Sequence, residues 1–297
     1  MQYGFFDDRN KEYVITTPKT PVKWINYVGG LPFGGFVDNT GGGLLCKGDP
    51  ASNRIIKYIA QMPAGEFKGQ TLYARTRSVG SNSAWNIITP YFVPGLQQWQ
   101  AWECRIGLGY TRFLTKFNDL EFDIRIFCPA VSKEHPLAAN REIRDIRVTN
   151  RGTQSVELDL IPVVEYTHFD ALKQLTNADW VPQTMQSEAH RNPDATVVLT
   201  QFAFMKKKIA ENYLTTNHAV SSFETDRKKF LGDNEYGTWA HPISLDQPEL
   251  SNTTVVRGDN IGALLHKMGV VAPGVSVRLI TQLGQEADPG TDRKSVV

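Results

Sequence analysis

The chain has 297 residues, of which 41% are hydrophobic and 21% are charged, as is usual for one large folded domain or two smaller ones. Its 32 lysines and arginines nearly balance its 31 aspartates and glutamates, so no charge excess points to nucleic acid or to a membrane surface as a partner. No apolar run approaches the roughly 20 residues that a membrane span needs, and the N-terminus lacks the basic and apolar regions of a signal peptide.

Glycine pairs and triplets are concentrated at the start of the chain. They are Gly29-Gly30, Gly34-Gly35 and Gly41-Gly42-Gly43. Their spacing matches neither a phosphate-binding Walker loop nor a dinucleotide fingerprint. We therefore expect tight turns and close backbone approach within a β-rich domain.

The middle of the chain has the pattern of β-strands. Residues 120–128 alternate apolar and polar side chains, which predicts a strand with one buried face. Residues 142–149 and 156–161 are two further strand candidates, separated by the turn Asn150-Arg151-Gly152-Thr153. This arrangement predicts an antiparallel hairpin.

The same pattern continues at 196–204, 213–223 and 275–283, whereas 205–212 fits a short helix or a charged loop. No helix-period stretch of 12 or more residues stands out. The predicted fold is all-β, a large antiparallel two-sheet sandwich. Because the chain turns polar after Gln285, we expect the domain to span 1–285 and to leave a tail of 286–297.

Side chains able to do chemistry are present but scattered. The acidic residues include Asp7, Asp8, Glu103, Glu121, Asp123 and Asp159, and their alternation along strands favours a solvated outer face. Six single histidines give no metal-ligating group, and no nucleophile elbow precedes a serine. We therefore expect no catalytic residue, no metal site and no cofactor in this chain.

Three cysteines lie far apart, at Cys46, Cys104 and Cys128. An odd, dispersed set fits neither a disulfide framework nor a metal cluster, so we expect packing residues and a reduced, cytoplasmic setting.

Several motifs occur in the order found in one enzyme family. They are Tyr3-Gly4-Phe5-Phe6-Asp7-Asp8, Trp24-Ile25-Asn26-Tyr27, Asn39-Thr40-Gly41-Gly42-Gly43, Gly107-Leu108-Gly109-Tyr110-Thr111-Arg112, and Thr225-Asp226-Arg227. Together they resemble the N-terminal domain of glycoside hydrolase family 94, the cellobiose, chitobiose and laminaribiose phosphorylases. The similarity covers residues 1 to about 285 in colinear order.

The resemblance implies a large supersandwich of the galactose-mutarotase type, with roles in carbohydrate binding and homodimerisation. It also implies a parent enzyme that cleaves a β-linked disaccharide with inorganic phosphate and inverts the anomeric centre to give an α-sugar-1-phosphate. The family's general acid, an aspartate, lies in a helical barrel with no counterpart here, so we expect this chain alone to be inactive.

One segment is expected to touch substrate. In the family, a loop that follows a Val-Glu-Phe strand reaches the rim of the partner subunit's active site. The matching stretch here starts at Val164-Glu165-Tyr166, and the resemblance assigns rim contacts to Thr176, Asn177, Asp179 and Trp180. An exposed tryptophan suits stacking on a pyranose ring, although Trp180 packing within its own loop is the alternative. A second aromatic group, Trp85, Trp99 and Trp102, favours core or dimer packing over sugar binding.

Two departures from the family remain. The family's Ser-Phe-Tyr is replaced by Leu44-Leu45-Cys46, which leaves the identity of the acceptor sugar open. Residues 292–297 resemble a translated sequencing adapter, so we expect the tail to be non-native or truncated. Two alternatives stay open: a stand-alone, non-catalytic carbohydrate-binding sandwich, and a fragment of a cyclic β-1,2-glucan synthase.

Overall fold

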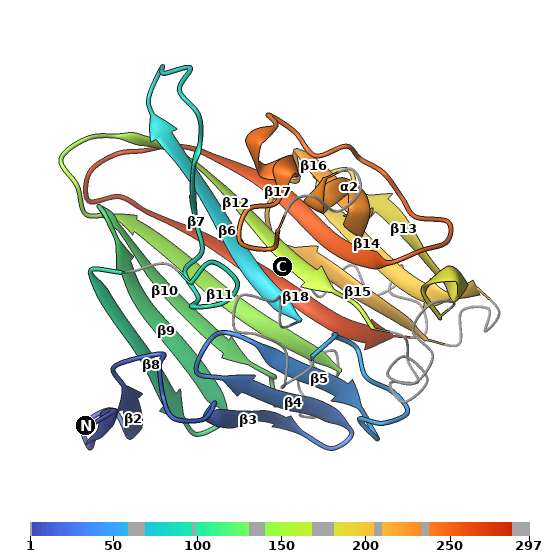
Figure 1. Cartoon of the computed structure of the whole chain (residues 1–297), viewed down its shortest axis with the longest axis horizontal. Coiled ribbons are helices and arrows are strands. Elements are labelled where there is room, and N and C mark those ends of the chain that lie inside the picture. Colours follow the sequence, from blue (N-terminus) through green and yellow to red (C-terminus); the bar gives the residue numbers. More distant parts are fainter. Residues whose placement is uncertain are drawn as a thin grey trace.

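A computed structural model describes residues 2–58, 69–96, 99–130, 140–167, 181–204, 210–232 and 238–286. Within these ranges the chain is almost entirely antiparallel β-sheet, arranged as two large sheets with a third, smaller one (Figure 1). The one α-helix of the described part is a single short turn, α2, at Arg227–Leu231. None of the described helices is long and apolar enough to cross a lipid bilayer.

The largest sheet has ten strands. In spatial order they are β1 (Gly4–Asp7), β2 (Glu12–Ile15), β8 (Ala101–Gly107), β9 (Tyr110–Phe117), β10 (Leu120–Phe127), β11 (Arg141–Asn150), β18 (Ser276–Glu286), β15 (Glu211–Thr216), β14 (Val197–Ala203) and β13 (Met185–Arg191).

Two smaller sheets pack against it. One has five strands in the order β16 (Ser222–Asp226), β17 (Asn260–Val271), β12 (Val156–Glu165), β6 (Gln70–Ser78) and β7 (Asn86–Ile88). The other has three, β3 (Ile25–Gly30), β4 (Phe33–Asp38) and β5 (Gly43–Lys47), shown in blue in Figure 1. Two 3-10 turns, η2 (Val181–Thr184) and η5 (Ile243–Asp246), lie in the connections.

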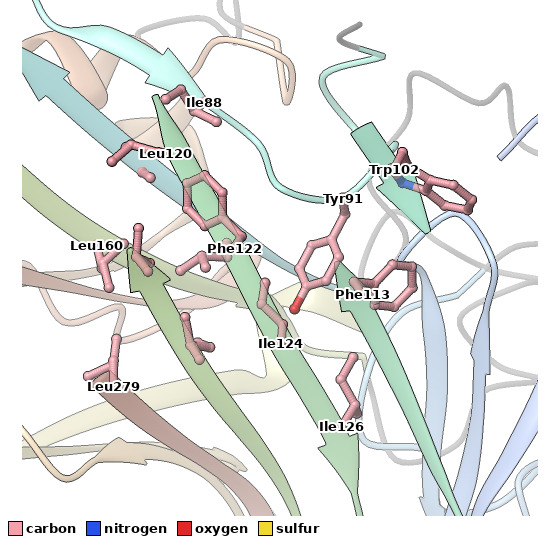
Figure 2. Packing of buried hydrophobic residues seen from close by; sticks show 14 of the residues in the cluster. Ile88, Tyr91, Trp102, Phe113, Leu120, Phe122, Ile124, Ile126, Leu160 and Leu279 are labelled. Atoms are coloured by element: carbon pink, nitrogen blue, oxygen red, sulfur yellow. The ribbon is translucent and has the colours of Figure 1, made fainter. Parts of the chain in front are cut away.

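The core lies between the sheets, as the period-two pattern predicts. On β10, Phe122, Ile124 and Ile126 point inward and are fully buried, while the residues between them face outward. Figure 2 shows these side chains together with Leu160 of β12 and with Phe113 of β9. The predicted all-β sandwich and the strand at 120–128 are therefore confirmed.

The predicted hairpin between 142–149 and 156–161 is wrong. Both segments are strands, but β11 pairs with β10 and β18, whereas β12 pairs with β6 and β17 in the other sheet. The side-chain amide of Asn150 donates to the carbonyls of Gln154 and Val271, and its Oδ1 accepts from the backbone of Gly152. These bonds direct the chain across the core instead of back along the same sheet.

A second strand boundary also differs from prediction. The segment 213–223 is not one strand, because β15 ends at Thr216 and β16 begins at Ser222 in the other sheet. The strands predicted at 196–204 and 275–283 correspond to β14 and β18. Of 205–212, residues 205–209 lie outside the described residues and Glu211 starts β15. Of the predicted tail 286–297, Glu286 is the last residue of β18, and 287–297 lie outside the described residues.

The glycines act as predicted. Gly41 has a φ of 98° and lies against Tyr91, where a Cβ would approach the Tyr91 side chain to 2.4 Å. Gly35 is a case of close approach, since a Cβ there would come within 1.8 Å of the Leu44 carbonyl oxygen of the neighbouring strand.

Candidate functional site

The four residues expected to touch substrate, Thr176, Asn177, Asp179 and Trp180, lie outside the described residues. The structure does describe the two ends of the surrounding segment. The chain reaches it along β12 through Tyr166 and Thr167, and it leaves through η2 into β13. We call Glu165, Tyr166 and Thr167 the loop root.

The carboxylate of Glu165 is the electrostatic centre of the loop root. Its side chain is only 7% exposed and accepts from Lys57 Nζ at 3.0 Å and pairs with Arg227 Nε at 3.2 Å. Its backbone is held as well, because its N–H donates to the Gly69 carbonyl and its carbonyl accepts from the Lys57 N–H. One nearly buried carboxylate is therefore shared by two cations.

The structure thereby joins two motifs that lie far apart in the sequence, one at Glu165 and one at Arg227. Arg227 belongs to the Thr225-Asp226-Arg227 motif, whose other members have structural roles. Asp226 caps α2 by accepting from the backbone of Lys228 and Lys229. The Thr225 hydroxyl donates to the Thr253 carbonyl and accepts from the Val255 N–H. The sequence did not connect Arg227 to Glu165, because nothing in the spacing indicates that β12 and β16 end on either side of the start of β17.

A ladder of four side-chain amides supports the last described residue before the loop. Gln201 donates to the Thr167 carbonyl at 3.4 Å and accepts from Asn212 at 2.8 Å. Asn212 in turn accepts from Gln285 at 2.9 Å, and Gln285 exchanges two hydrogen bonds of 2.8 Å with Asn53. The three strand residues are direct cross-strand partners and face the interior. We call this set the amide ladder.

Replacing Asn212 by Leu is expected to lower the free energy of unfolding by about 2 kcal/mol, because the buried Gln201 and Gln285 amides each lose a partner. Chemical denaturation measures the change, and Asn82→Leu, at an exposed position, is the control. Equal effects of the two substitutions would contradict the role of the ladder.

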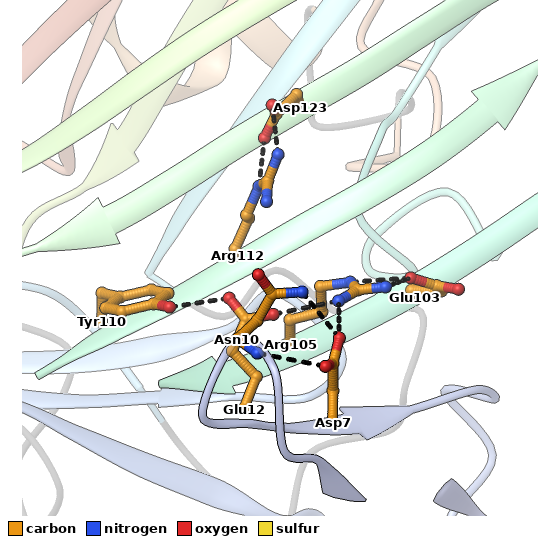
Figure 3. A network of polar contacts seen from close by, with 8 residues as sticks. All are labelled: Asp7, Asn10, Glu12, Glu103, Arg105, Tyr110, Arg112 and Asp123. Carbon is orange, nitrogen blue, oxygen red and sulfur yellow. Dashed lines mark hydrogen bonds and ion pairs between the residues drawn. The ribbon is translucent and has the colours of Figure 1, made fainter. Parts of the chain in front are cut away.

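A second polar group is built from the motifs of the N-terminal part of the chain. Figure 3 shows Arg105 of β8 between Asp7, Glu12 and Glu103, at distances of 3.1, 3.0 and 2.8 Å. The Tyr110 hydroxyl donates to Glu12 at 2.7 Å. Burial, and after it the hydrogen bond to Glu12, raises the pKa of Tyr110.

Adjacent strands extend this group on the outer face of the large sheet. Arg112 donates twice to Asp123, both at 2.7 Å, and this pairing raises the pKa of Arg112. Hydrogen bonds from Asn10 lower the pKa of Asp7. Because these carboxylates bind guanidinium groups in fixed geometry, they hold β1 and β2 against the sheet and are unsuited to proton transfer.

The prediction that the acidic residues form a solvated outer face is wrong for Asp159. Its side chain is 6% exposed and accepts from Arg75 Nε at 2.8 Å. Burial raises the pKa of the Asp159 carboxyl more than Arg75 lowers it. Glu224 is also buried with a raised pKa, and it accepts from the backbone of Thr225 and Asp226. Both carboxyls are enclosed by protein donors and do not face solvent.

The remaining predicted positions have packing roles. Trp102 is 8% exposed and Trp99 packs against it, with ring centroids 6.4 Å apart. Trp85 lies beneath the guanidinium groups of Arg75 and Arg77, at 4.6 and 4.2 Å. Core packing is therefore the role of this aromatic group.

The cysteines, and Leu45 of the replaced segment 44–46, also have packing roles. Cys104 is fully buried, Cys46 and Cys128 are partly buried, and all three are free thiols. Leu45 is fully buried in the core, so this departure from the family is a packing position. No set of three or more His, Cys, Asp or Glu side chains placed to hold a metal ion occurs in the described ranges.

An antiparallel sandwich of ten and five strands, with polar groups fixing its loop ends, defines a β-supersandwich domain. Comparison with known proteins gives the family: a model described as "Glycosyl hydrolase 94, supersandwich domain" matches residues 11–296, and the chain belongs to that family.

Several relatives of this chain are phosphorylases. An N,N'-diacetylchitobiose phosphorylase of Vibrio proteolyticus is 26% identical over 96% of this chain and 33% of that protein. A solabiose phosphorylase of Paenibacillus borealis is 24% identical over 95% of this chain and 34% of that protein. The chain thus spans about a third of the length of these relatives. A bacterial glucoamylase structure with acarbose shares the fold, with a TM-score of 0.50 and 7% identity over 96% of this chain and 37% of that one.

Proposed function

We propose that this chain is the N-terminal domain of an inverting β-glycoside phosphorylase, and that residues 176–180 contact the saccharide at the rim of the active site. The observation that carries the proposal is the family match over residues 11–296, in a chain one third as long as its phosphorylase relatives. The substrate class is a β-linked disaccharide, with inorganic phosphate as co-substrate.

In such a reaction, phosphate attacks the anomeric carbon from the face opposite the leaving sugar, while one carboxylic acid protonates the leaving oxygen. Asp7, Glu12 and Asp159 are paired with arginines, and the carboxyl of Glu224 is enclosed, which agrees with the assignment of the acid to the part of the enzyme outside this domain. The contribution of this domain is to position the saccharide, and the fixed loop root supports that role.

We also propose that the full-length enzyme is a cytoplasmic homodimer in which this domain reaches the partner subunit. Three free cysteines agree with a reducing compartment. Light scattering on the longer gene product tests the dimer.

The experiment for the activity is a phosphorolysis and synthesis assay on the longer gene product that contains this chain. Release of phosphate from a sugar-1-phosphate is expected with one of the acceptors glucose, gluconate or N-acetylglucosamine. Absence of release with all three would reject the disaccharide phosphorylase proposal.

Trp180→Ala is expected to weaken saccharide binding about tenfold, or ~1.4 kcal/mol, because an aromatic face that stacks on a pyranose is lost. Isothermal titration of the longer gene product with the disaccharide measures the affinity. Trp85→Ala serves as the control, since Trp85 packs beneath two arginines and is expected to change stability and leave the affinity of the folded fraction unchanged. Unchanged affinity in Trp180→Ala would remove Trp180 from the rim.

A further inference from the structure

The outer face of the three-stranded sheet is apolar. Ile25 and Tyr27 of β3 are 42% and 72% exposed, and Leu31 in the β3–β4 turn is 93% exposed. The register places Tyr27 opposite Phe36, and Phe36 opposite Leu44, so these side chains share one face. We call Ile25, Tyr27, Leu31, Phe36 and Leu44 the small-sheet face.

This face differs from the outer face of the ten-stranded sheet. There, paired charges such as Arg112–Asp123 and Arg278–Asp145 cover the strands, as expected for a surface that meets water. On the small-sheet face the outward charged position is Asp38, and its carboxylate is buried and accepts from Thr40 and from the Tyr58 hydroxyl. Tyr58 packs on part of this face, with its ring 5.1 Å from that of Phe36 and with Lys23 Nζ 5.7 Å from the Tyr58 ring centroid. Ile25, Tyr27 and Leu31 stay exposed, and exposed apolar side chains that lie close together are typical of a surface that another protein segment covers.

The face adjoins the end of β18. The Pro32 carbonyl, next to Leu31, accepts from the Gly48 N–H at 2.6 Å, and Asn53 exchanges hydrogen bonds with Gln285 at 2.8 Å. Gln285 is the penultimate residue of β18. In Figure 1 the end of the red strand β18 lies beside the blue small sheet. Any polypeptide that continues from β18 therefore starts next to the small-sheet face.

We propose that the small-sheet face is the docking surface for the polypeptide that follows β18 in the full-length phosphorylase, and that this polypeptide presents apolar side chains to it. The inference rests on the proposed function. About two thirds of each phosphorylase relative lies outside the region that this chain matches, so a long polypeptide would be present to cover the face. The position of the face beside Gln285 selects it over the exposed apolar residues at the β17–β18 turn, Val270 and Val275.

Hydroxyl-radical footprinting of this chain and of the longer gene product tests the proposal. Oxidation of Tyr27 and Leu31 is expected to fall several-fold in the longer product, whereas oxidation of Val270 stays the same. Leu31→Ser is expected to lower the thermal midpoint of the longer product and to leave that of the isolated chain unchanged, because Leu31 is exposed there. Val270→Ser, the matched control, is expected to change neither midpoint.

Equal oxidation of Tyr27 and Leu31 in the two proteins would overturn the docking surface, even if the longer product carries out phosphorolysis. Protection that appears in the isolated chain with rising concentration, together with dimers in light scattering, would assign the face to a second copy and would also overturn it. Protection in a longer product that lacks phosphorolysis would support the docking surface and reject the proposed function.

Discussion

Replacing Arg75 by Met is expected to lower the free energy of unfolding by about 3–5 kcal/mol, the range found when one partner of a buried ion pair is removed. The Arg75 side chain is fully buried on β6. Its Nε donates to Asp159, and its two other nitrogens donate to the carbonyls of Leu245, Gln247 and Pro248. Methionine would leave a buried carboxylate without its cation and three carbonyls without their donor.

The neighbouring Arg77 provides a matched control. It lies on the same strand, stacks on the same Trp85 ring and pairs with Glu157, but both side chains are about a quarter exposed. Arg77→Met is therefore expected to cost no more than about 1 kcal/mol. Urea denaturation of both variants measures the difference. If the two substitutions cost the same, Arg75 does not hold the 245–248 segment in place.

A double variant separates the ion pair from the carbonyl contacts. In Arg75→Met with Asp159→Leu, the buried carboxylate is gone as well, so the double variant is expected to be more stable than Arg75→Met alone. The remaining loss would then measure the three carbonyls that Arg75 served. A double variant less stable than the single one would contradict this assignment.

Local pattern predicts a strand most clearly where one face lies against the core and the other faces outward, whereas strands such as β14 and β15 are buried along their whole length. The alternation at 120–128 gave β10 within one residue. Pairing was harder to predict. The turn at Asn150 has the composition of a hairpin, but the Asn150 side chain bonds to Val271 of β17, a contact 121 residues away that no local pattern contains.

The same limit applies to buried polar residues. Asp159 alternates with apolar neighbours as an outward residue would, and only the position of Arg75, 84 residues earlier, explains its burial. The amide ladder likewise joins Asn53 and Gln285 across 232 residues. For the candidate site, family resemblance identified Glu165 and Arg227 separately, and the structure was needed to place them in contact.

Acid is expected to destabilise this domain through His266. This side chain of β17 is fully buried, its Nδ1 lies 2.9 Å from the Ala219 carbonyl, and its Nε2 has no hydrogen-bond partner among the described residues. Burial lowers the pKa of His266 to about 4, outweighing the opposite effect of the Ala219 hydrogen bond. The His218 ring lies beside that of His266, with ring centroids 5.9 Å apart, and disfavours a second positive charge there.

The direction of this change in the free energy of unfolding follows from the protons bound by the folded and the unfolded state. An unfolded histidine titrates near pH 6.5, so between that pH and about 4 the unfolded state holds a proton that the folded state lacks. The stabilisation is present above pH 6.5 and is lost as the pH falls. The free energy of unfolding is expected to drop by ~1.4 kcal/mol per pH unit, about 3 kcal/mol in total. Raised carboxyl pKa values at Asp159 and Glu224 act in the opposite direction.

His266→Asn isolates the histidine from those carboxyls, because it keeps an N–H for the Ala219 carbonyl and removes the titrating group. Urea denaturation at several pH values between 4 and 7 should show wild type losing stability relative to His266→Asn as the pH falls. His241→Asn, which removes an exposed histidine outside the core, is the matched control. Parallel pH profiles for wild type and His266→Asn would show that the buried ring is not the acid-sensitive group. Acid sensitivity would then belong to carboxyls whose pKa is lowered by their hydrogen-bond partners, such as Asp7 and Asp145.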